Sequence, residues 1–190
     1  MAVDSYMYFQ NYDNSYLHSE AQNAFLGNKE GLAAAFAAAN DAHGLFELED
    51  YSFDIEQVLN IGSQSSGASA GKITFNPFSI TRKIDIASPL LFQDACTGGP
   101  IKNVGLGLRK STGGKSSGVF FLVFTFKLVA VKTISWAHDA ESPKETITFE
   151  YGGLVTQYAQ QKADGSLLPP VVRGWNRVRN IAADVDTVVM

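Results

Sequence analysis

Residues 119–128 read Val-Phe-Phe-Leu-Val-Phe-Thr-Phe-Lys-Leu, and this stretch decides the fold class. Its even-numbered residues, Phe120 to Leu128, are all apolar, and a period of two is that of a β-strand. The odd-numbered residues are also apolar as far as Val123 and become polar at Thr125. The pattern predicts a strand that is covered on both faces at one end and on one face at the other.

Alternating segments continue on both sides of this strand. The pattern predicts further strands near residues 2–9, 46–55, 73–80, 104–108, 145–151 and 171–181. The parity of the apolar residues changes at Glu49-Asp50, which indicates a bulge. Gly105 and Gly107 leave one face of their strand bare, which is useful where a helix or another backbone approaches closely. The fold class is therefore mainly β, a β-barrel or sandwich of antiparallel strands.

Two helical segments interrupt the strands. The first is alanine-rich, covers Ala24 to Asp41 and has Gly44 as its expected stop. The second has Ser88 as its expected N-cap, Pro89 in the first turn and Gly98 at its end. We expect an extra inserted helix within residues 22–44 and a short flanking helix after residue 88.

Residues 60–71 form a long segment without a periodic apolar face. They are Asn60, Ile61, Gly62, Ser63, Gln64, Ser65, Ser66, Gly67, Ala68, Ser69, Ala70 and Gly71. A loop of this length inside a compact domain is uncommon and usually functional. Docking onto a neighbouring molecule is one candidate for its role.

The composition indicates one ordered domain over residues 1–190. Apolar residues make up 45% and charged residues 18% of the chain, and no linker divides it. The net charge of -4 and the pI of about 5.3 disfavour a nucleic-acid partner. The single Cys96 excludes an internal disulfide and favours assembly in a reducing compartment.

The sequence predicts neither a secretory signal peptide nor a membrane-spanning helix. Residues Met1 to Tyr6 lack the basic start and apolar run of a secretory signal peptide. The apolar run Val119 to Phe126 is far shorter than the ~20 residues that cross a bilayer as a helix. We predict no signal peptide and no membrane span.

Two patterns that carry catalysis in other proteins are incomplete here. Gly114-Lys115-Ser116 matches the end of a phosphate-binding P-loop, but Arg109 stands where that pattern needs a glycine. Cys96 could act as a nucleophile with His18, His43 or His138. Its position in an apolar helix instead predicts a small buried hydrophobe. We therefore predict no catalytic residue.

Two further clusters contain residue types that bind ligands in other proteins. His138, Asp139 and Glu141 lie close together but lack the spacing of a metal site. Basic and aromatic residues share one parity of the last strand: Arg173, Trp175, Arg177 and Arg179. Such interleaving occurs in single-strand nucleic-acid binding, but one strand makes no groove and the net charge is negative. We predict no metal, no cofactor and no nucleic acid, with the arginines paired to carboxylates.

Four short motifs follow one another along the chain. They are Ala70-Gly71-Lys72 after the long loop, Ser88-Pro89-Leu90-Leu91 at the second helix, Gln161-Lys162-Ala163-Asp164-Gly165 in a turn, and Gly174-Trp175-Asn176 in the last strand. In this order and spacing the chain resembles the Hcp family, the haemolysin-coregulated proteins. The resemblance covers most of residues 46–183 and the first strand.

The resemblance implies a β-barrel with a flanking helix, similar to phage tail-tube proteins, that assembles into homohexameric rings. In this family the stacked rings form the inner tube of the type VI secretion machine, which a contractile sheath propels outward, and effectors can ride in the channel. The implied partners are further copies of the chain, the sheath, the spike and effector proteins. The implied location is the cytoplasm during assembly, followed by secretion. By family position, the loop at 60–71 contacts the adjacent ring.

Two departures leave other readings open. The insert at 22–44 is longer than the family usually carries, and the chain extends through 184–190. A different class is a monomeric β-barrel that binds a small ligand, which needs convergent polar groups in an apolar interior. The uniformly apolar face from Phe120 to Leu128 predicts a filled interior instead. A hydrolase built on Cys96 is the third possibility.

Overall fold

The computed structural model describes residues 3–21, 29–60, 69–110, 118–138 and 142–184. Its strands are β1 (Val3–Gln10), β2 (Phe46–Glu47), β3 (Asp50–Ser52), β4 (Ile55–Asn60), β5 (Ser69–Phe75), β6 (Phe78–Lys83), β7 (Pro100–Lys110), β8 (Val119–His138), β9 (Pro143–Tyr158), β10 (Val171–Asn176) and β11 (Ile181–Ala183). Its helices are the 3-10 turn η1 (Gly31–Ala33), α1 (Ala34–Asp41) and α2 (Ser88–Thr97). Strands dominate, so the predicted mainly β class is confirmed.

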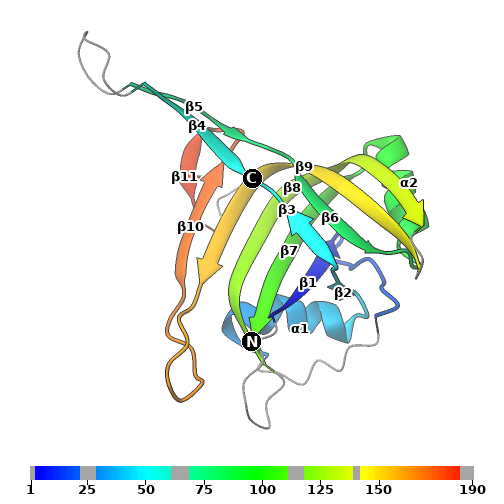
Figure 1. The fold of residues 1–190 in the computed structure, drawn as a ribbon, viewed down its shortest axis with the longest axis horizontal. Helices are drawn as coiled ribbons and strands as arrows, with labels where there is room; N and C mark the ends of the chain where they lie inside the picture. The colour runs from blue at the N-terminus through cyan, green and yellow to red at the C-terminus, as the bar shows by residue number, and fades with distance from the viewer. Residues whose placement is uncertain (1–2, 22–28, 61–68, 111–117, 139–141, 185–190) are drawn as a thin grey trace.

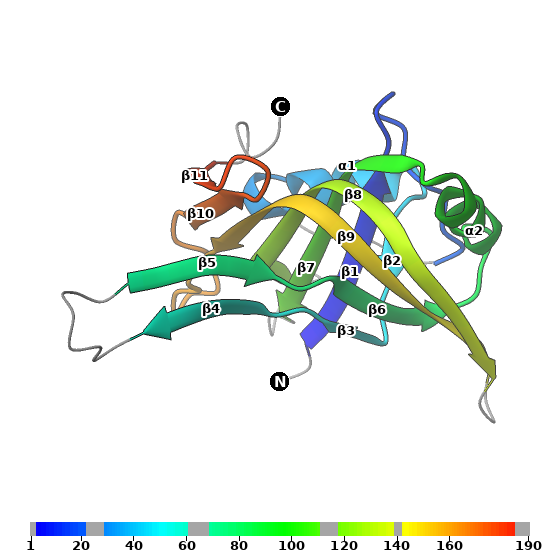
Figure 2. The same cartoon turned by 90° about the horizontal axis from the view of Figure 1, so that it is seen from above.

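Most strands form one antiparallel sheet in the order β11-β10-β9-β8-β7-β1-β2. β6 pairs with the first half of β9, and β3 pairs with β6. The sheet curls around a core, and the β4–β5 hairpin extends away from it (Figures 1 and 2). Within the described ranges no ladder joins β2 to β3, so hydrogen bonds do not close the predicted barrel.

The chain itself crosses the seam between β2 and β3. The Leu48 N–H donates to the Ser5 carbonyl on one side, and the next N–H, that of Glu49, donates to the Thr81 carbonyl on the other. Residues 46–52 therefore bond first to β1 and then to β6. The predicted bulge at Glu49-Asp50 is wrong, because the parity change marks this crossing.

The larger core lies inside the curled sheet. The Phe78 ring stacks on Phe126, with 4.0 Å between ring centroids, and on Phe149, at 4.7 Å. All three side chains are buried, as is Leu91 from α2. We call this cluster the inner core, and it confirms the predicted half-buried strand around Phe149.

A second cluster, the α1 core, lies on the other face of the sheet. Alternation along β1 separates the two, because Met7 and Phe9 belong to the inner core whereas Tyr6 and Tyr8 belong to the α1 core. Phe36 of α1 stacks on Phe120 at 4.4 Å between centroids. It also meets Tyr8 edge-on at 5.1 Å.

Two glycines of β7 make room on this face, Gly107 for Phe36 of the helix and Gly105 for Tyr8 of the paired strand β1. A Cβ on Gly107 would lie 2.5 Å from Phe36 Cζ, and a Cβ on Gly105 would lie 2.2 Å from Tyr8 Cε1. Both distances are too short for real atoms, so only glycine fits at either position. The expectation that a helix approaches this bare face is confirmed.

A bulge in β8 places Phe120 on the same side of the sheet as Val123. The β7–β8 register shifts between Leu108↔Leu122 and Arg109↔Phe120. The extra residue turns the Phe120 side chain to the α1 core, while Phe126 remains in the inner core. The prediction of one continuous face from Phe120 to Leu128 is therefore wrong.

The predicted inserted helix is shorter in the structure. α1 begins at Ala34, and residues 22–28 lie outside the described residues. His43, with φ of 54°, takes the left-handed position after the helix that we expected for Gly44. Gly44 is needed for close approach instead, because a Cβ there would lie 2.6 Å from Tyr16 Cβ.

The predicted strand at 171–181 is two strands, β10 and β11. Asn176 pairs with Ile181, and Asn180 between them has φ of 55°. The Asn176 side chain accepts a hydrogen bond from the Arg179 N–H at 2.9 Å, as asparagine does in tight turns. A Cβ on Gly174 would lie 2.8 Å from the Ala183 carbonyl oxygen, so this position needs glycine.

Candidate assembly surfaces

The turn at Gln161 to Gly165 is built from local hydrogen bonds. Asp164 Oδ1 accepts from the Ser166 N–H at 2.9 Å and from Ser166 Oγ at 2.6 Å. These bonds lower the pKa of Asp164 below its ordinary value. Gly165 has φ of 86°, and Gln161 Nε2 donates to its carbonyl at 3.2 Å. The motif makes a turn, and Lys162 in it is exposed.

The same turn chemistry occurs at the end of β1. Asp13 Oδ1 accepts from the Ser15 N–H at 2.9 Å, and the residue between them, Asn14, has φ of 66°. Both turns are closed by an isolated antiparallel bridge, Gln10↔Tyr16 in one and Gln161↔Leu167 in the other. An aspartate that accepts from the N–H two residues on is a general turn former, so this motif positions backbone.

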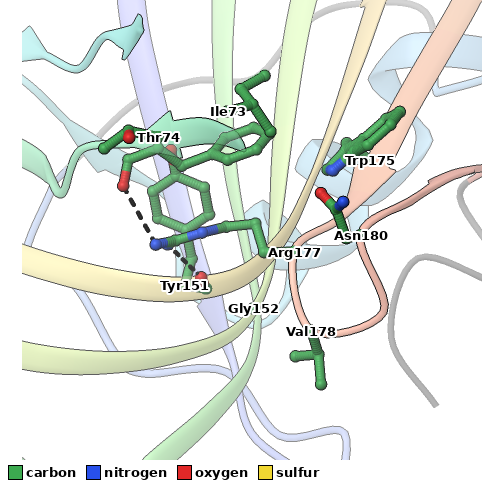
Figure 3. A pocket seen from close by; sticks show the side chains of 9 residues that line it. Ile73, Thr74, Tyr151, Gly152, Trp175, Arg177, Val178 and Asn180 are labelled. Carbon is green, nitrogen blue, oxygen red and sulfur yellow. Dashed lines mark hydrogen bonds between the residues drawn. The ribbon is translucent and has the colours of Figure 1, made fainter. Parts of the chain in front are cut away.

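The Gly174-Trp175-Asn176 motif lies beside a pocket of about 480 Å³ (Figure 3). The pocket opens where two strands share one edge of β9, since β6 pairs as far as Phe149 and β10 pairs from Gly153. Its lining consists of Ile73, Thr74, Phe75, Tyr151, Gly152, Trp175, Arg177, Val178 and Asn180. The pocket thus lies between the base of the β4–β5 hairpin and the β10–β11 pair.

Arg177 bridges the two walls of this pocket. Its Nη2 donates to the Phe75 carbonyl at 3.1 Å, and its Nη1 donates to the Tyr151 carbonyl (Figure 3). Its own N–H donates to the Gly152 carbonyl at 2.9 Å. The guanidinium also lies 4.6 Å from the centre of the Tyr151 ring. Arg177 therefore ties the end of β5 to β9.

Two polar atoms near this bridge are buried. The Trp175 indole nitrogen and the Tyr151 hydroxyl have no hydrogen-bond partner among the described residues. Burial raises the pKa of Tyr151 to about 12. Tyr151 remains a neutral phenol at physiological pH.

The β4–β5 hairpin contains the predicted loop. Asn60 ends β4 and Ser69 to Gly71 open β5, with Leu59↔Ala70 and Asn60↔Ser69 paired. The predicted loop of residues 60–71 is therefore partly strand, and residues 61–68 lie outside the described residues. Lys72 is in β5. Neither outer edge of this hairpin is paired within the part of the chain that the structure describes.

The start of α2 is joined to β9 by a buried charge network. Arg82 Nη2 lies 2.6 Å from Glu145 Oε1, and Ser88 Oγ donates to the same oxygen at 2.9 Å. Arg82 Nη1 donates to Asp85 Oδ1 at 2.8 Å. Arg82 is 2% exposed and Glu145 is fully buried. Removal of either partner would leave the other charge buried and unpaired, which is strongly destabilising.

This network corrects the prediction for Ser88. The N-cap of α2 is Ala87, and no side chain caps the helix. Ser88 is the first helical residue, and its hydroxyl donates to Glu145. Pro89 in the first turn and Gly98, with φ of 69° at the end, are as predicted. The sequence contained a signal for the network, since Glu145 lies in phase with the buried Ile147 of its strand.

The first comparison with known proteins concerns the family. The model described as "Type VI secretion system effector, Hcp" matches residues 37–158. The chain belongs to the Hcp family. Protein hcp1 of Pseudomonas aeruginosa is 32% identical to it over 115 residues, which are 59% of this chain and 70% of that protein.

Solved structures share the fold of this Hcp chain. The structure of a type six secretion system protein has a TM-score of 0.74 and 20% identity, and the match covers 96% of this chain and all of that one. Hcp1 from Salmonella typhimurium has a TM-score of 0.66 and 19% identity, with coverage of 96% and 100%. The family match begins within α1, so η1 precedes it.

Other candidate residues of this Hcp chain are placed as follows. Cys96 is exposed, so the prediction of a buried thiol is wrong; α2 instead turns Leu91 inward. Arg177 Nη1 lies 3.5 Å from Glu150 Oε2, whereas Arg173 donates to its neighbouring carbonyl at Val172. In the described ranges, no three His, Cys, Asp or Glu side chains cluster as metal ligands, and no helix has the length and apolarity to span a membrane.

Proposed function

We propose that this Hcp chain is a structural subunit of the type VI secretion tube, which assembles into stacked homohexameric rings. The observation that carries the proposal is the β4–β5 hairpin, which projects from the sheet with neither outer edge paired among the described residues. A two-stranded hairpin alone is marginally stable in water, and unpaired strand edges favour pairing with another chain. A neighbouring copy that covers the hairpin would meet both needs.

The base of the hairpin supports this role. Arg177 bonds to the carbonyls of Phe75 and Tyr151, so the end of β5 is held against the sheet. A projecting element that is fixed at its base loses less conformational entropy on docking. In this proposal the segment at 60–71 contacts the adjacent ring.

The remaining partners follow from the same role. The rings would be enclosed by the contractile sheath, capped by the spike and loaded with effectors in the channel. The chain would assemble in the cytoplasm and leave with the tube. The chain is a component of the machine in this proposal, and no residue of it is assigned a catalytic role.

The alternative of a monomeric barrel with an internal small ligand is less well supported. The stacked aromatic side chains of Phe78, Phe126 and Phe149 fill the middle of the curled sheet. The pocket beside Trp175 lies at the hairpin base instead. A ligand-binding reading would have to use that surface pocket.

The test is the absolute mass in solution, measured by light scattering on a gel-filtration column across a dilution series. A hexamer of the 20.5 kDa chain has a mass of 6 × 20.5 = 123 kDa. A variant in which Asn-Gly replaces residues 57–73 removes the hairpin and is expected to lose stacking or the ring. A wild-type chain that stays at 20.5 kDa at every concentration would overturn the proposal.

A further inference from the structure

The pocket at the base of the β4–β5 hairpin has the size of a small-molecule site. Its volume is about 480 Å³, within the range of roughly 300–1,000 Å³ that ligand pockets occupy. One wall comes from β5, one from β9, and one from β10 with the turn that follows it (Figure 3). All three walls belong to one chain, so a single copy contains the whole pocket.

The charge inside the pocket is positive. Among the described residues that line it, Arg177 alone is charged. Two carboxylates lie close by but outside the lining, and both have partners. Glu150 Oε1 accepts from Lys132 Nζ at 3.0 Å, and Asp54 Oδ2 accepts from Asn76 Nδ2 at 2.7 Å. The described lining therefore presents one positive charge to a ligand and no negative charge.

The Arg177 guanidinium is fixed in place but not fully used. It donates to the carbonyls of Phe75 and Tyr151, and it lies 5.4 Å and 4.6 Å from the centres of these two rings. Its Nη1 also lies 3.5 Å from Glu150 Oε2. These contacts leave N–H groups of the guanidinium without an acceptor among the described residues. A guanidinium that is already ordered loses less entropy when it binds a carboxylate.

Two further hydrogen-bond donors of the lining lack an acceptor. Trp175 Nε1 and the Tyr151 hydroxyl are buried and have no hydrogen-bond partner among the described residues. An indole N–H can only donate, and a buried donor without a partner costs free energy. A ligand that brought hydrogen-bond acceptors into this wall would offset that cost. The polar chemistry of the pocket thus favours an acceptor over a donor.

We propose that this pocket binds a small organic carboxylate with an apolar body. The carboxylate accepts charge-assisted hydrogen bonds from Arg177, which are stronger than those of a neutral ligand. The apolar body packs against Ile73, Val178 and the ring of Trp175, which line the same pocket. This binding site goes beyond the tube role and does not depend on the ring, because one chain supplies all of its walls.

The test is fluorine NMR of the full chain labelled with fluorotryptophan. The chain has two tryptophans, of which Trp175 lines the pocket and Trp136 does not. One signal therefore reports binding and the other is an internal control, and Trp136→Phe assigns them. The probe is benzoate, and benzamide is its uncharged counterpart. We expect benzoate to shift the Trp175 signal saturably, and benzamide at the same concentration to leave it unchanged.

Two substitutions at the exposed rim test the charge without disturbing the fold. Val178 is 70% exposed, so Val178→Asp and its uncharged match Val178→Asn should have the circular dichroism of the wild type. The added carboxylate repels the ligand, so benzoate should bind Val178→Asp about tenfold more weakly than Val178→Asn.

A second pair of variants tests the guanidinium. Arg177→Lys keeps the positive charge but loses the planar fork, and it should weaken benzoate binding by about tenfold. The matched control is Arg173→Lys, because Arg173 lies on the same strand region outside the pocket lining and donates to the Val172 carbonyl. This control should bind benzoate as the wild type does.

Three outcomes would overturn the proposal. Benzoate that causes no saturable shift would exclude the site. Equal affinity for benzoate and benzamide would show that the apolar body alone is recognised. Equal binding of benzoate to Val178→Asp and Val178→Asn would place the ligand elsewhere. A wild-type chain that binds benzoate but stays at 20.5 kDa would support this site and remove only the ring function.

Discussion

The inner core and the α1 core lie on opposite faces of the same strands and are built differently. Phe78, Phe126 and Phe149 of the inner core come from three strands that the sheet brings together. The α1 core has one large side chain from its helix, Phe36, which fits over Gly107. One core is held by the whole sheet, whereas the other depends on a short element added to it.

The difference shows what each core needs from the chain. α1 has eight residues and no side-chain cap, and a helix of that length is unstable in water by itself. Its stability therefore comes from packing of Phe36 against Phe120 and Tyr8. The stack at the centre of the inner core has no comparable weak element, because Phe78, Phe126 and Phe149 each belong to a strand of the main sheet. Loss of packing in the inner core should thus destabilise the whole fold, whereas loss of packing in the α1 core should destabilise mainly α1.

The largest effect is expected for Phe78→Ala in the inner core. Removal of a fully buried ring that stacks on two others should lower the free energy of unfolding by about 3–5 kcal/mol. Urea unfolding followed by circular dichroism measures it. The change should appear as one cooperative transition at lower urea. If Phe78→Ala lowered hydrogen-exchange protection at only a few amides, the inner core would not stabilise the whole fold.

Phe36→Ala in the α1 core should cost less. The helix can undock before the sheet unfolds, so the measured loss should be limited to about 2 kcal/mol. Hydrogen exchange should quicken at residues 34–41 while the β8 and β9 amides stay protected. If hydrogen exchange quickened as much at the β8 and β9 amides as at residues 34–41, the two cores would be one cooperative unit.

Gly107→Ala tests the fit between the helix and the sheet. The added Cβ would lie 2.5 Å from Phe36 Cζ, and such overpacking costs about 1–3 kcal/mol. The matched control is the double variant with Phe36→Ala, in which the contact with Phe36 is removed and that with Phe120 Cδ1, at 2.7 Å, remains. The double variant should lose less free energy of unfolding than the sum of the losses of the two single variants, because both substitutions break the same contact. If the two free-energy losses were fully additive, the strain in Gly107→Ala would not come from its contact with Phe36.

Tyr151→Phe should have the smallest effect and the opposite sign. The Tyr151 hydroxyl is buried without a partner among the described residues, so its removal should stabilise the chain by about 1 kcal/mol at neutral pH. A clear destabilisation in urea would mean that the hydroxyl has a partner.

The same variant gives a pH test. Burial raises the pKa of Tyr151 to about 12, while the unfolded phenol titrates near 10. Stability is full below pH ~10 and falls as pH rises to about 12, because only the unfolded chain releases the proton. Tyr151→Phe should show a shallower fall between these values. Burial also raises the pKa of Tyr8 in the α1 core, so Tyr8→Phe is the matching variant for the other face.

Several features were predictable because they depend on local residue patterns. The alternation around Phe149 identified a half-buried strand, and the bare face of Gly105 and Gly107 indicated an approaching helix. The motif order indicated the family that the comparisons then showed. These features follow from residue size, turn chemistry and periodicity within a few positions of each other.

Other features were wrong because they depend on distant contacts. Ser88 was expected to cap α2, but Glu145, 57 residues away, takes its hydroxyl. The face from Phe120 to Leu128 was expected to be continuous, but the bulge opposite Arg109 divides it. Cys96 was expected to be buried, but the side of α2 that packs is the one with Leu91.

The amino-acid sequence by itself determined the mainly β class, the flanking helix with its Gly98 end, and the turns built by Asp13 and Asp164, because each is encoded by local propensity. Only the tertiary structure decided that Phe120 joins the α1 core while Phe126 joins the inner core, since the extra residue between Phe120 and Leu122 shifts the alternation there. It alone also paired Arg82 with Glu145. Those outcomes depend on which distant segments meet, and no local pattern encodes that.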